Sequence, residues 1–208
     1  MNSPQKSLSL GRIFNFEIMK RLCSVLMAAL VAVTVASSAT KSEICIVPYP
    51  NEIATGEGFF NAEGADVTYD AALDEASVNV IRSFAQNLTL VSGADNVVSA
   101  GKSDKGFVFV MNASLAPEAY SLVVNPECVR VEASSLRGFN YAVQTIKQLL
   151  PVAVYSKDPS PETAWVIPAV RIYDEPRYAY RGLHFDVSRH FFGVEEVKRY
   201  RDLMEVHK

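Results

Sequence analysis

Three pairs of adjacent acidic residues are the first candidates for chemistry in this sequence. They are Asp74 with Glu75, Asp174 with Glu175, and Glu195 with Glu196. Two neighbouring carboxyl groups can act as the acid and the base of one reaction. The first and third pairs, however, fall in the first turn of predicted helices, where the helix dipole favours acidic side chains. The second pair falls in a predicted connection. We therefore predict that none of the three is catalytic.

An arginine just past a predicted strand is the best candidate for binding a ligand. Arg189 follows the strand expected at 181–187 and precedes His190. A guanidinium group offers a fork of donors that suits two neighbouring hydroxyl groups. Asp186 could hold Arg189 or His190 in place as a hydrogen-bond acceptor. The residues alone favour the alternatives, which are a salt bridge of Arg189 at the strand end and a buried, satisfied histidine at position 190.

A single βα unit must position these residues. Leu183, Phe185 and Val187 alternate with polar residues, which predicts a strand over 181–187 that begins with a stabilising Arg181. Apolar residues at helical spacing predict a helix over 194–208. One strand and one helix cannot bury their apolar faces alone. We interpret this unit as the start of a repeating βα fold, and we expect apolar side chains of its helix to be exposed.

Residues 40–173 predict a separate domain with two helices and about five strands. The helices are expected at 74–90 and 136–150, the second capped by Ser134 or Ser135. The strands are expected at 44–47, 107–111, 120–124, 129–131 and 166–172. Because the helices can cover one face of a sheet, the expected architecture is a two-layer α/β sandwich of the α+β class.

Residues 1–39 predict an export signal. A short basic region precedes the apolar run 22–36, and a small-x-small cleavage site ends at Ala39. A membrane span needs about 20 apolar residues, so a retained anchor is the weaker interpretation. Residues 1–18 would make the signal too long, which favours Met19 as the true start. We expect a secreted or periplasmic protein, more in keeping with a bacterium.

The remaining composition excludes several kinds of partner. The net charge is −3, and no cluster of Lys and Arg is interleaved with aromatic residues. This argues against nucleic acid and against a membrane surface after signal cleavage. Cys45 and Cys128 either pair in an oxidising compartment or remain two buried thiols, and we favour the thiols. We predict no metal site and no cofactor, since the cysteine spacing matches no metal motif.

Several motifs resemble the family 20 β-N-acetylhexosaminidases. The run Phe-Asp-Val-Ser-Arg-His-Phe-Phe at 185–192 resembles the opening of the catalytic barrel in that family. Residues 171–176, 180–182 and 195–200 resemble the segments around it, while 138–150 and 47–50 are similar to the last helix and the first strand of the N-terminal α/β domain of the family. Taken together, these similarities cover nearly all of the chain after the export signal.

The resemblance implies an exo-acting enzyme that removes terminal β-linked N-acetylglucosamine or N-acetylgalactosamine from oligosaccharides or glycans. Catalysis in this family is retaining and substrate-assisted, because the acetamido oxygen of the substrate is the nucleophile. An Asp orients the acetamide and an adjacent Glu protonates the leaving oxygen. Both come from a later barrel strand, which we expect beyond Lys208. The resemblance also implies that Arg189 binds sugar hydroxyls.

The expected organisation is an export signal at 1–39, an N-terminal α/β domain at 40–173, and the start of a truncated catalytic TIM barrel at 174–208. A complete (β/α)₈ barrel takes about 250 residues and carries its active site at the C-terminal ends of its strands. None of the three acidic pairs is placed there, so we expect the chain as given to be inactive. The alternatives are a non-catalytic accessory or carbohydrate-binding module and a fragment of a neighbouring glycosidase family that shares the N-terminal domain.

Overall fold

The computed structural model describes residues 44–208, and the predicted export signal, with its alternative start at Met19, lies outside them. A seven-stranded sheet occupies the centre of this part of the chain. The strands are β1 (Glu52–Asn61), β2 (Val67–Tyr69), β3 (Val98–Ala100), β4 (Gly106–Met111), β5 (Tyr120–Val124), β6 (Cys128–Ala133) and β7 (Val166–Asp174). The helices are α2 (Glu75–Ser92), α3 (Leu136–Leu149) and α4 (Val194–Val206), and η1 (Val152–Tyr155) is a short 3-10 turn.

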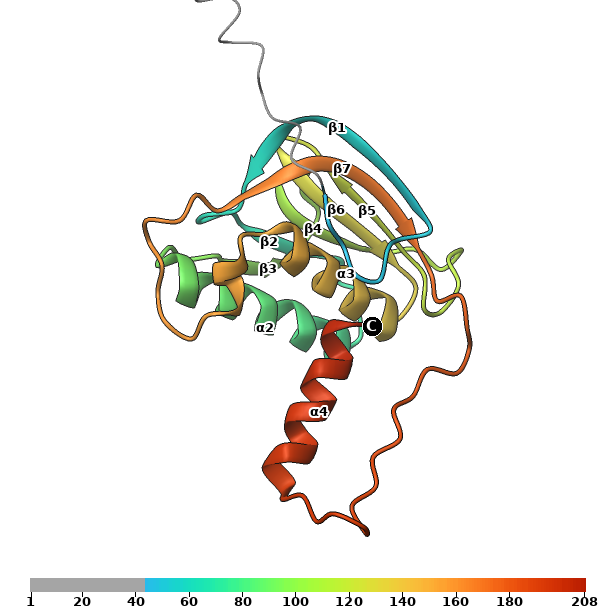
Figure 1. Cartoon of the computed structure of the whole chain (residues 1–208). Coiled ribbons are helices and arrows are strands. Elements are labelled where there is room, and N and C mark those ends of the chain that lie inside the picture. The colour runs from blue at the N-terminus through green and yellow to red at the C-terminus, as the bar shows by residue number, and fades with distance from the viewer. Residues whose placement is uncertain (1–43) are drawn as a thin grey trace, which may run out of the picture. The chain divides into compact units, whose positions relative to one another are not determined.

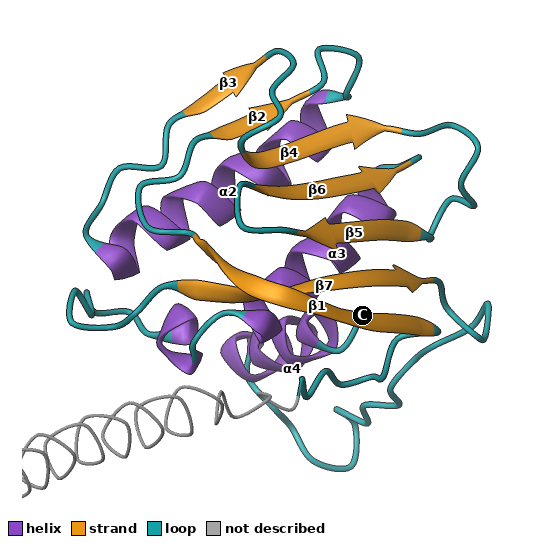
Figure 2. Ribbon diagram, turned by 90° about the horizontal axis from the view of Figure 1, so that it is seen from above, coloured by secondary structure: helices purple, strands orange, loops and turns teal. Residues whose placement is uncertain are grey.

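The sheet is mixed, with the spatial order β1-β7-β5-β6-β4-β2-β3. Strands β3, β2, β4 and β6 run parallel to one another, whereas β5 is antiparallel to both β6 and β7, and β1 is antiparallel to β7. Helices α2 and α3 both cover one face of the sheet (Figures 1 and 2). The antiparallel pairing places Tyr120, the first residue of β5, directly opposite Asp174, the last residue of β7.

Both covering helices begin at side chains that cap them. Asp74 precedes α2, and its Oδ1 accepts a hydrogen bond from the backbone N–H of Ser77 at 2.6 Å. Ser135 precedes α3, and its hydroxyl oxygen accepts from the backbone N–H of Arg137 at 3.2 Å. Such caps satisfy N–H groups that have no partner inside the helix. The predicted helices are therefore confirmed, and Ser135 is the residue that caps the second one.

The core lies between the sheet and the two helices. Four phenylalanines at its centre are at most 1% exposed: Phe84, Phe107, Phe109 and Phe139. The Phe84 ring from α2 packs edge-on against Phe107 of β4, with centroids 5.2 Å apart. Phe139 from α3 lies 6.3 Å from Phe109 of the same strand. The predicted mixed fold with helices on one face is thus present in residues 44–174, which we call the sheet domain.

The strand predicted at 44–47 is wrong. The backbone of Val47 bonds to a side chain instead: its N–H donates to Gln148 Oε1 at 2.8 Å, and its C=O accepts from Gln148 Nε2 at 2.9 Å. The strand at this edge of the sheet is β1, in the glycine-rich stretch that follows. Its pairing with β7 is irregular between Thr55 and Phe59, where Gly58 has a positive φ of 92°. Glycine in a strand is typical of such irregularities, and it obscured the strand pattern in the sequence.

The strand predicted at 181–187 is also wrong. Residues 175–193 contain no helix or strand, whereas the predicted helix is confirmed as α4. A strand needs neighbours that accept and donate its backbone hydrogen bonds, and none of the described strands runs beside 181–187. Helix α4 has no buried residue, and Val194, Val197, Tyr200 and Met204 are exposed as predicted. We call residues 175–208 the C-terminal segment.

The two cysteines of the described part are free thiols. Cys128 is buried in β6, and Cys45 is exposed. The prediction of two buried thiols is therefore right for Cys128 and wrong for Cys45. Burial raises the pKa of the Cys128 thiol, which keeps it protonated and weakly reactive.

Candidate functional site

The structure brings Asp186 and Arg189 together in the irregular chain before α4. Asp186 Oδ1 accepts hydrogen bonds from the backbone N–H groups of Ser188 at 2.9 Å and of Arg189 at 3.1 Å. Its Oδ2 lies 3.5 Å from Nε of Arg189. The Arg189 side chain is 92% exposed. Asp186 therefore shapes the turn and holds the near side of the guanidinium, while the far side faces solvent.

His190 lies beside this pair but does not join it. It is exposed, and its ring centroid is 5.8 Å from that of Phe192. Within residues 44–208, no hydrogen bond links His190 to Asp186 or to Arg189. Phe185 stacks on Phe192 and Tyr200 at 4.9 Å and 4.5 Å, so an aromatic cluster at the start of α4 supports this stretch. The interpretation of His190 as a buried histidine is therefore wrong, whereas its role in supporting a binding site remains a prediction.

A cavity of about 390 Å³ lies at the end of β7, where the sheet domain meets the C-terminal segment. Its lining is rich in ionisable side chains, and six of them form two clusters: Glu118, Asp174, Tyr120, Tyr141, Arg181 and Lys208. These residues come from the start of β5, from α3, from the end of β7 and from the C-terminal segment. The cavity is thus a meeting point of segments that are far apart in the sequence.

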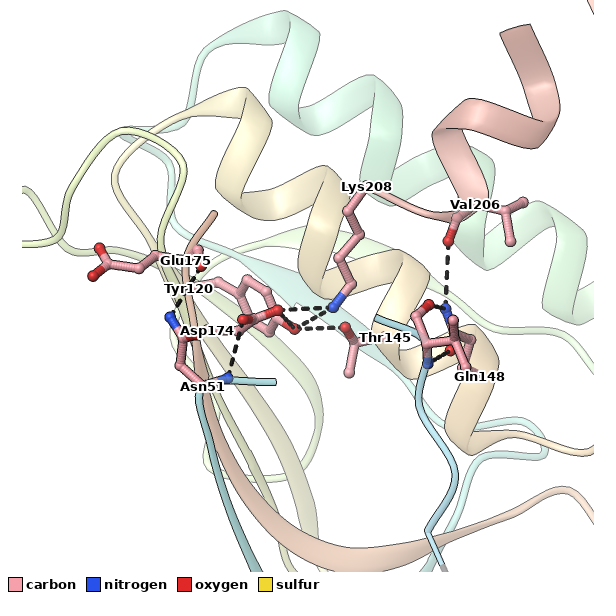
Figure 3. Close-up of polar contacts among 9 residues, drawn as sticks. Asn51, Tyr120, Thr145, Gln148, Asp174, Glu175, Val206 and Lys208 are labelled. Carbon is pink, nitrogen blue, oxygen red and sulfur yellow. Dashed lines mark hydrogen bonds and ion pairs between the residues drawn. The ribbon is translucent and has the colours of Figure 1, made fainter. Parts of the chain in front are cut away.

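The Asp174 carboxylate is the centre of the first cluster in this cavity (Figure 3). Its Oδ2 accepts hydrogen bonds from the Tyr120 hydroxyl at 3.1 Å and from Nζ of Lys208 at 2.9 Å, while Oδ1 accepts from the backbone N–H of Asn51 at 3.2 Å. The Tyr120 hydroxyl also bonds to the hydroxyl of Thr145, 2.6 Å away on α3. Burial, followed by the charge of Asp174, raises the pKa of Tyr120, so this phenol stays protonated. Burial also lowers the pKa of Lys208, although Asp174 opposes that effect.

Glu118 is the centre of the second cluster. Its Oε1 lies 3.2 Å from the Tyr141 hydroxyl and 3.4 Å from Nη2 of Arg181. Nη2 of Arg181 also donates to the Tyr141 hydroxyl at 2.7 Å, and the guanidinium carbon lies 5.6 Å from the centre of the Tyr141 ring. Burial alone would raise the pKa of Glu118, but Arg181, Tyr141 and Arg137 together hold that pKa below its usual value.

A close approach of α3 to the chain before β5 brings Glu118 to Tyr141. A Cβ atom on Gly138 would lie 2.5 Å from the carbonyl oxygen of Ala119 and 2.9 Å from Cβ of Ala133. Only glycine fits there without a shift of the backbone. Tyr141 lies one turn further along the same helix, so the absent side chain at position 138 sets the distance between Tyr141 and Glu118.

The charges around Glu118 and Asp174 do not suit an acid–base pair. A catalytic acid needs a carboxyl group whose pKa is raised towards the working pH, whereas the pKa of Glu118 is lowered. Asp174 was predicted to lie in a connection, and this is wrong, because it is the last residue of β7. Lys208 compensates the charge of its carboxylate. The arrangement suits the binding of cations.

The other two acidic pairs have structural roles that agree with the prediction. Asp74 caps α2, and Glu75 lies in its first turn. Glu195 and Glu196 lie in the first turn of α4, where they form ion pairs with residues three positions further on, at 2.8 Å and 3.7 Å. Across residues 44–208 no three His, Cys, Asp or Glu side chains converge as they would around a metal ion. In the same residues, no helix has both the length and the apolar composition to cross a bilayer.

Sequence reasoning missed Glu118, Tyr120 and Tyr141. Tyr141, which lines the cavity, and Thr145, which bonds to Tyr120, are four positions apart on α3 and therefore lie on one face of the helix. That polar pair beside an apolar stripe was the available signal. The partners at 118, 174 and 208 carry no comparable pattern, because they meet only through the fold.

Two family models match consecutive parts of this chain. Residues 43–175 match "Glycosyl hydrolase family 20, domain 2", which is 133 of the 208 residues. The chain belongs to glycosyl hydrolase family 20. Residues 178–208 match the "Glycosyl hydrolase family 20, catalytic domain". The family 20 chain is therefore related to glycoside hydrolases in both its sheet domain and its C-terminal segment.

Curated relatives and solved structures agree with this assignment. The chain is 30% identical over 174 residues to a β-N-acetylhexosaminidase of Cellulomonas fimi, a match covering 80% of this chain and 33% of the relative. It is 28% identical to a β-hexosaminidase of Porphyromonas gingivalis, covering 79% and 21%. The N-acetyl-β-hexosaminidase structure of Streptomyces plicatus matches with a TM-score of 0.70 and 31% identity, over 78% of this chain and 32% of that one. The family 20 chain thus spans between about a fifth and a third of the length of these relatives.

Proposed function

We propose that this chain is the N-terminal portion of an exo-acting β-N-acetylhexosaminidase. The observation that carries the proposal is the order of the two family 20 matches, in which domain 2 is followed directly by the start of the catalytic domain. The substrates would be oligosaccharides or glycans that end in β-linked N-acetylglucosamine or N-acetylgalactosamine. Residues 1–39 would direct secretion or export to the periplasm and then be removed.

The proposed chemistry is retaining and substrate-assisted. The acetamido oxygen of the sugar attacks its own anomeric carbon while an acid protonates the departing oxygen, and water then opens the resulting ring with the configuration retained. The acid and the acetamide-orienting carboxylate would come from a barrel strand that follows position 208. General acid catalysis alone contributes about 10²–10⁴-fold. The 208-residue chain by itself would therefore be inactive.

Arg189 is the proposed sugar-binding residue of this chain. Its contact with Asp186 uses Nε. Within residues 44–208, this contact leaves both terminal nitrogens of the fork for a ligand, and the side chain is open to solvent. Two such nitrogens suit a pair of neighbouring hydroxyl groups. In the complete barrel, residues 181–187 would pair with neighbouring strands, and Arg189 would then stand at the C-terminal end of the first strand, where barrel active sites are built.

The test is hydrolysis of a chromogenic aryl β-N-acetylglucosaminide by the 208-residue chain and by the same chain extended through any open reading frame downstream. We expect activity in the extended protein alone. Activity in the 208-residue chain would contradict the placement of the catalytic pair beyond Lys208. An inactive extended protein that is folded would contradict the hydrolase itself.

Arg189 is tested in the extended protein. Loss of charge-assisted hydrogen bonds to hydroxyl groups costs about 1.5–3 kcal/mol, so Arg189→Met should lower kcat/KM about 10- to 100-fold. The matched control is Arg199→Met, because Arg199 is an exposed arginine on α4 whose one ion pair within residues 44–208 is with Glu196. Equal kcat/KM values for the two variants would show that Arg189 does not bind the sugar.

A further inference from the structure

Two acid–tyrosine pairs line the cavity at the end of β7, and each binds one cation of the C-terminal segment. Glu118 and Tyr141 bind Arg181, while Asp174 and Tyr120 bind Lys208. Both acids and both tyrosines belong to the sheet domain. Both cations belong to the segment that follows it. The cavity therefore joins the two parts of the chain through two chemically similar contacts.

The Lys208 contact is the more buried of the two. The Lys208 side chain is 6% exposed and that of Asp174 is 11% exposed. Nζ of Lys208 also bonds to the Tyr120 hydroxyl at 2.8 Å and lies 5.1 Å from the centre of the Tyr120 ring. A buried charge without its partner is strongly unfavourable. Each of the two charges can therefore be buried only because the other is buried beside it.

The Arg181 contact is partly open to solvent but has more attachment points. The Arg181 side chain is 30% exposed and that of Glu118 is 24% exposed. The guanidinium binds the Glu118 carboxylate, the Tyr141 hydroxyl and, through Nη1, the carbonyl oxygen of Tyr178 at 2.8 Å. Its position over the Tyr141 ring adds a cation–π contact. One side chain thus fixes the irregular chain between β7 and α4.

Helix α4 needs such a contact, because it has little else to stabilise it. It is 13 residues long and has no buried residue. An isolated helix of this length is marginal in water. Figure 1 shows α4 running away from α2 and α3, with only its C-terminal end beside α3. There, Gln144 Nε2 lies 3.4 Å from Glu205 Oε1, and Gln148 Nε2 donates to the carbonyl oxygen of Val206 at 3.3 Å.

We propose that this cavity is an intramolecular docking site, in which the two acid–tyrosine pairs bind Arg181 and Lys208 and thereby hold the C-terminal segment on the sheet domain. The occupant is this chain's own segment, because both cations already lie in the cavity. Arg181 positions the beginning of the segment, and Lys208 positions the end of α4. The proposal concerns the fold of residues 44–208 and is independent of any hydrolytic activity.

The experiment is hydrogen exchange of the full chain, measured by mass spectrometry on peptides from the C-terminal segment. Lys208→Met should raise the exchange of residues 194–206 about tenfold or more, because an undocked α4 approaches the marginal stability of a free helix. Asp174→Asn should have the same effect from the other side of the pair. The double variant should add little to either single change, since all three remove one contact.

Arg181→Met and Glu118→Gln are the two variants that test the contact between Arg181 and Glu118. Both should raise the exchange of residues 176–184, and Glu118→Gln keeps the size of the side chain while removing its charge. The matched controls are Lys198→Met and Arg199→Met, exposed cations of α4 that, in the described part of the chain, pair with Glu195 and Glu196 alone. We expect the controls to change exchange at 176–184 by less than twofold.

Peptides from β4 and β6, which contribute no residue to the two contacts, serve as the internal reference for these measurements. Docking predicts that exchange in the C-terminal segment rises relative to this reference. If the variants raise exchange equally in both places, or if Lys208→Met and Arg181→Met behave like Lys198→Met and Arg199→Met, then these cations do not hold the segment and the proposal is overturned.

Discussion

Strand β5 and residues 181–187 share a sequence pattern that is typical of strands, but only β5 forms a strand. In both, apolar residues recur at every second position: Tyr120, Leu122 and Val124 in β5, and Leu183, Phe185 and Val187 in the second stretch. In β5, Tyr120 and Leu122 are at most 1% exposed, because the strand pairs with β6 and β7 and faces the helices. In the second stretch, Leu183 is 54% exposed and Val187 is 44% exposed, and no strand forms. An alternating pattern states which face a strand can bury, but neighbours decide whether a strand exists.

The difference extends to how each part is stabilised. The sheet domain rests on a continuous apolar core between one sheet and two capped helices. The C-terminal segment has an aromatic cluster at the start of α4 and two cations in a polar cavity. Substitutions of equal chemical size should therefore have very different effects in the two parts, and each of the following tests uses that contrast.

The largest effect is expected from Phe109→Ala in β4. Phe109 is fully buried, so the substitution removes a large apolar contact and leaves a cavity, which costs about 3–5 kcal/mol. Urea denaturation followed by circular dichroism should show this loss in the free energy of unfolding. A loss below about 1 kcal/mol would mean that the core does not carry the stability of the sheet domain.

Gly138→Ala should have the second largest effect. The new Cβ would lie 2.5 Å from a backbone oxygen, so either the helix or the chain at Ala119 must shift, at a cost of about 1–3 kcal/mol. Gly193→Ala is the control, because a Cβ there meets nothing within 4 Å and its φ is −68°. Thermal denaturation of both variants measures the contrast, and equal melting temperatures would contradict the close approach of α3.

Asp74→Ala should cost about 1 kcal/mol, the usual contribution of a helix cap. The hydrogen bond from the backbone N–H of Ser77 holds the pKa of Asp74 below its usual value of 3.8. A lowered pKa stabilises the fold above the unfolded value, and that contribution disappears as the pH falls through the folded pKa. Denaturation at several pH values should therefore show the cost at pH 7 and a shrinking cost as the pH falls below the usual value of 3.8.

The control for this cap is Asp74→Asn, whose side-chain oxygen still accepts a hydrogen bond but does not titrate. Its stability difference from Asp74→Ala should be independent of pH over the same range. If the two variants instead show the same pH dependence as the parent, the titrating group lies elsewhere.

The smallest effect is expected from Leu203→Ala in α4. Leu203 is 54% exposed, and surface substitutions usually change the free energy of unfolding by less than about 0.5 kcal/mol. The two variants Leu203→Ala and Phe109→Ala can be compared directly in the same urea denaturation experiment. A cost at Leu203 comparable to that of Phe109→Ala would mean that α4 is buried in solution.

Much of the fold could be predicted where a segment is long and its pattern is regular. Helices α2 and α3 follow from their apolar periodicity, α3 also from its capping serine, and β5 follows from the spacing and turn chemistry of a hairpin. Strands β2 and β3 have three residues each, too few to show a period of two. Strand β1 was hidden by its glycines. The sequence also indicated the proximity of Asp186 and Arg189, because three positions in one turn suffice to join them.

The sequence by itself determined the local elements, their caps and the contacts made within a few residues. Only the tertiary structure decided which alternating stretches became strands, and which acids became partners of the cations at 181 and 208. Glu118 and Arg181 are 63 positions apart, and Asp174 and Tyr120 are 54 apart. Hydrogen bonds between strands and ion pairs in a cavity require partners brought from distant parts of the chain. No local pattern records those partners, whereas a helix carries most of its hydrogen bonds within itself.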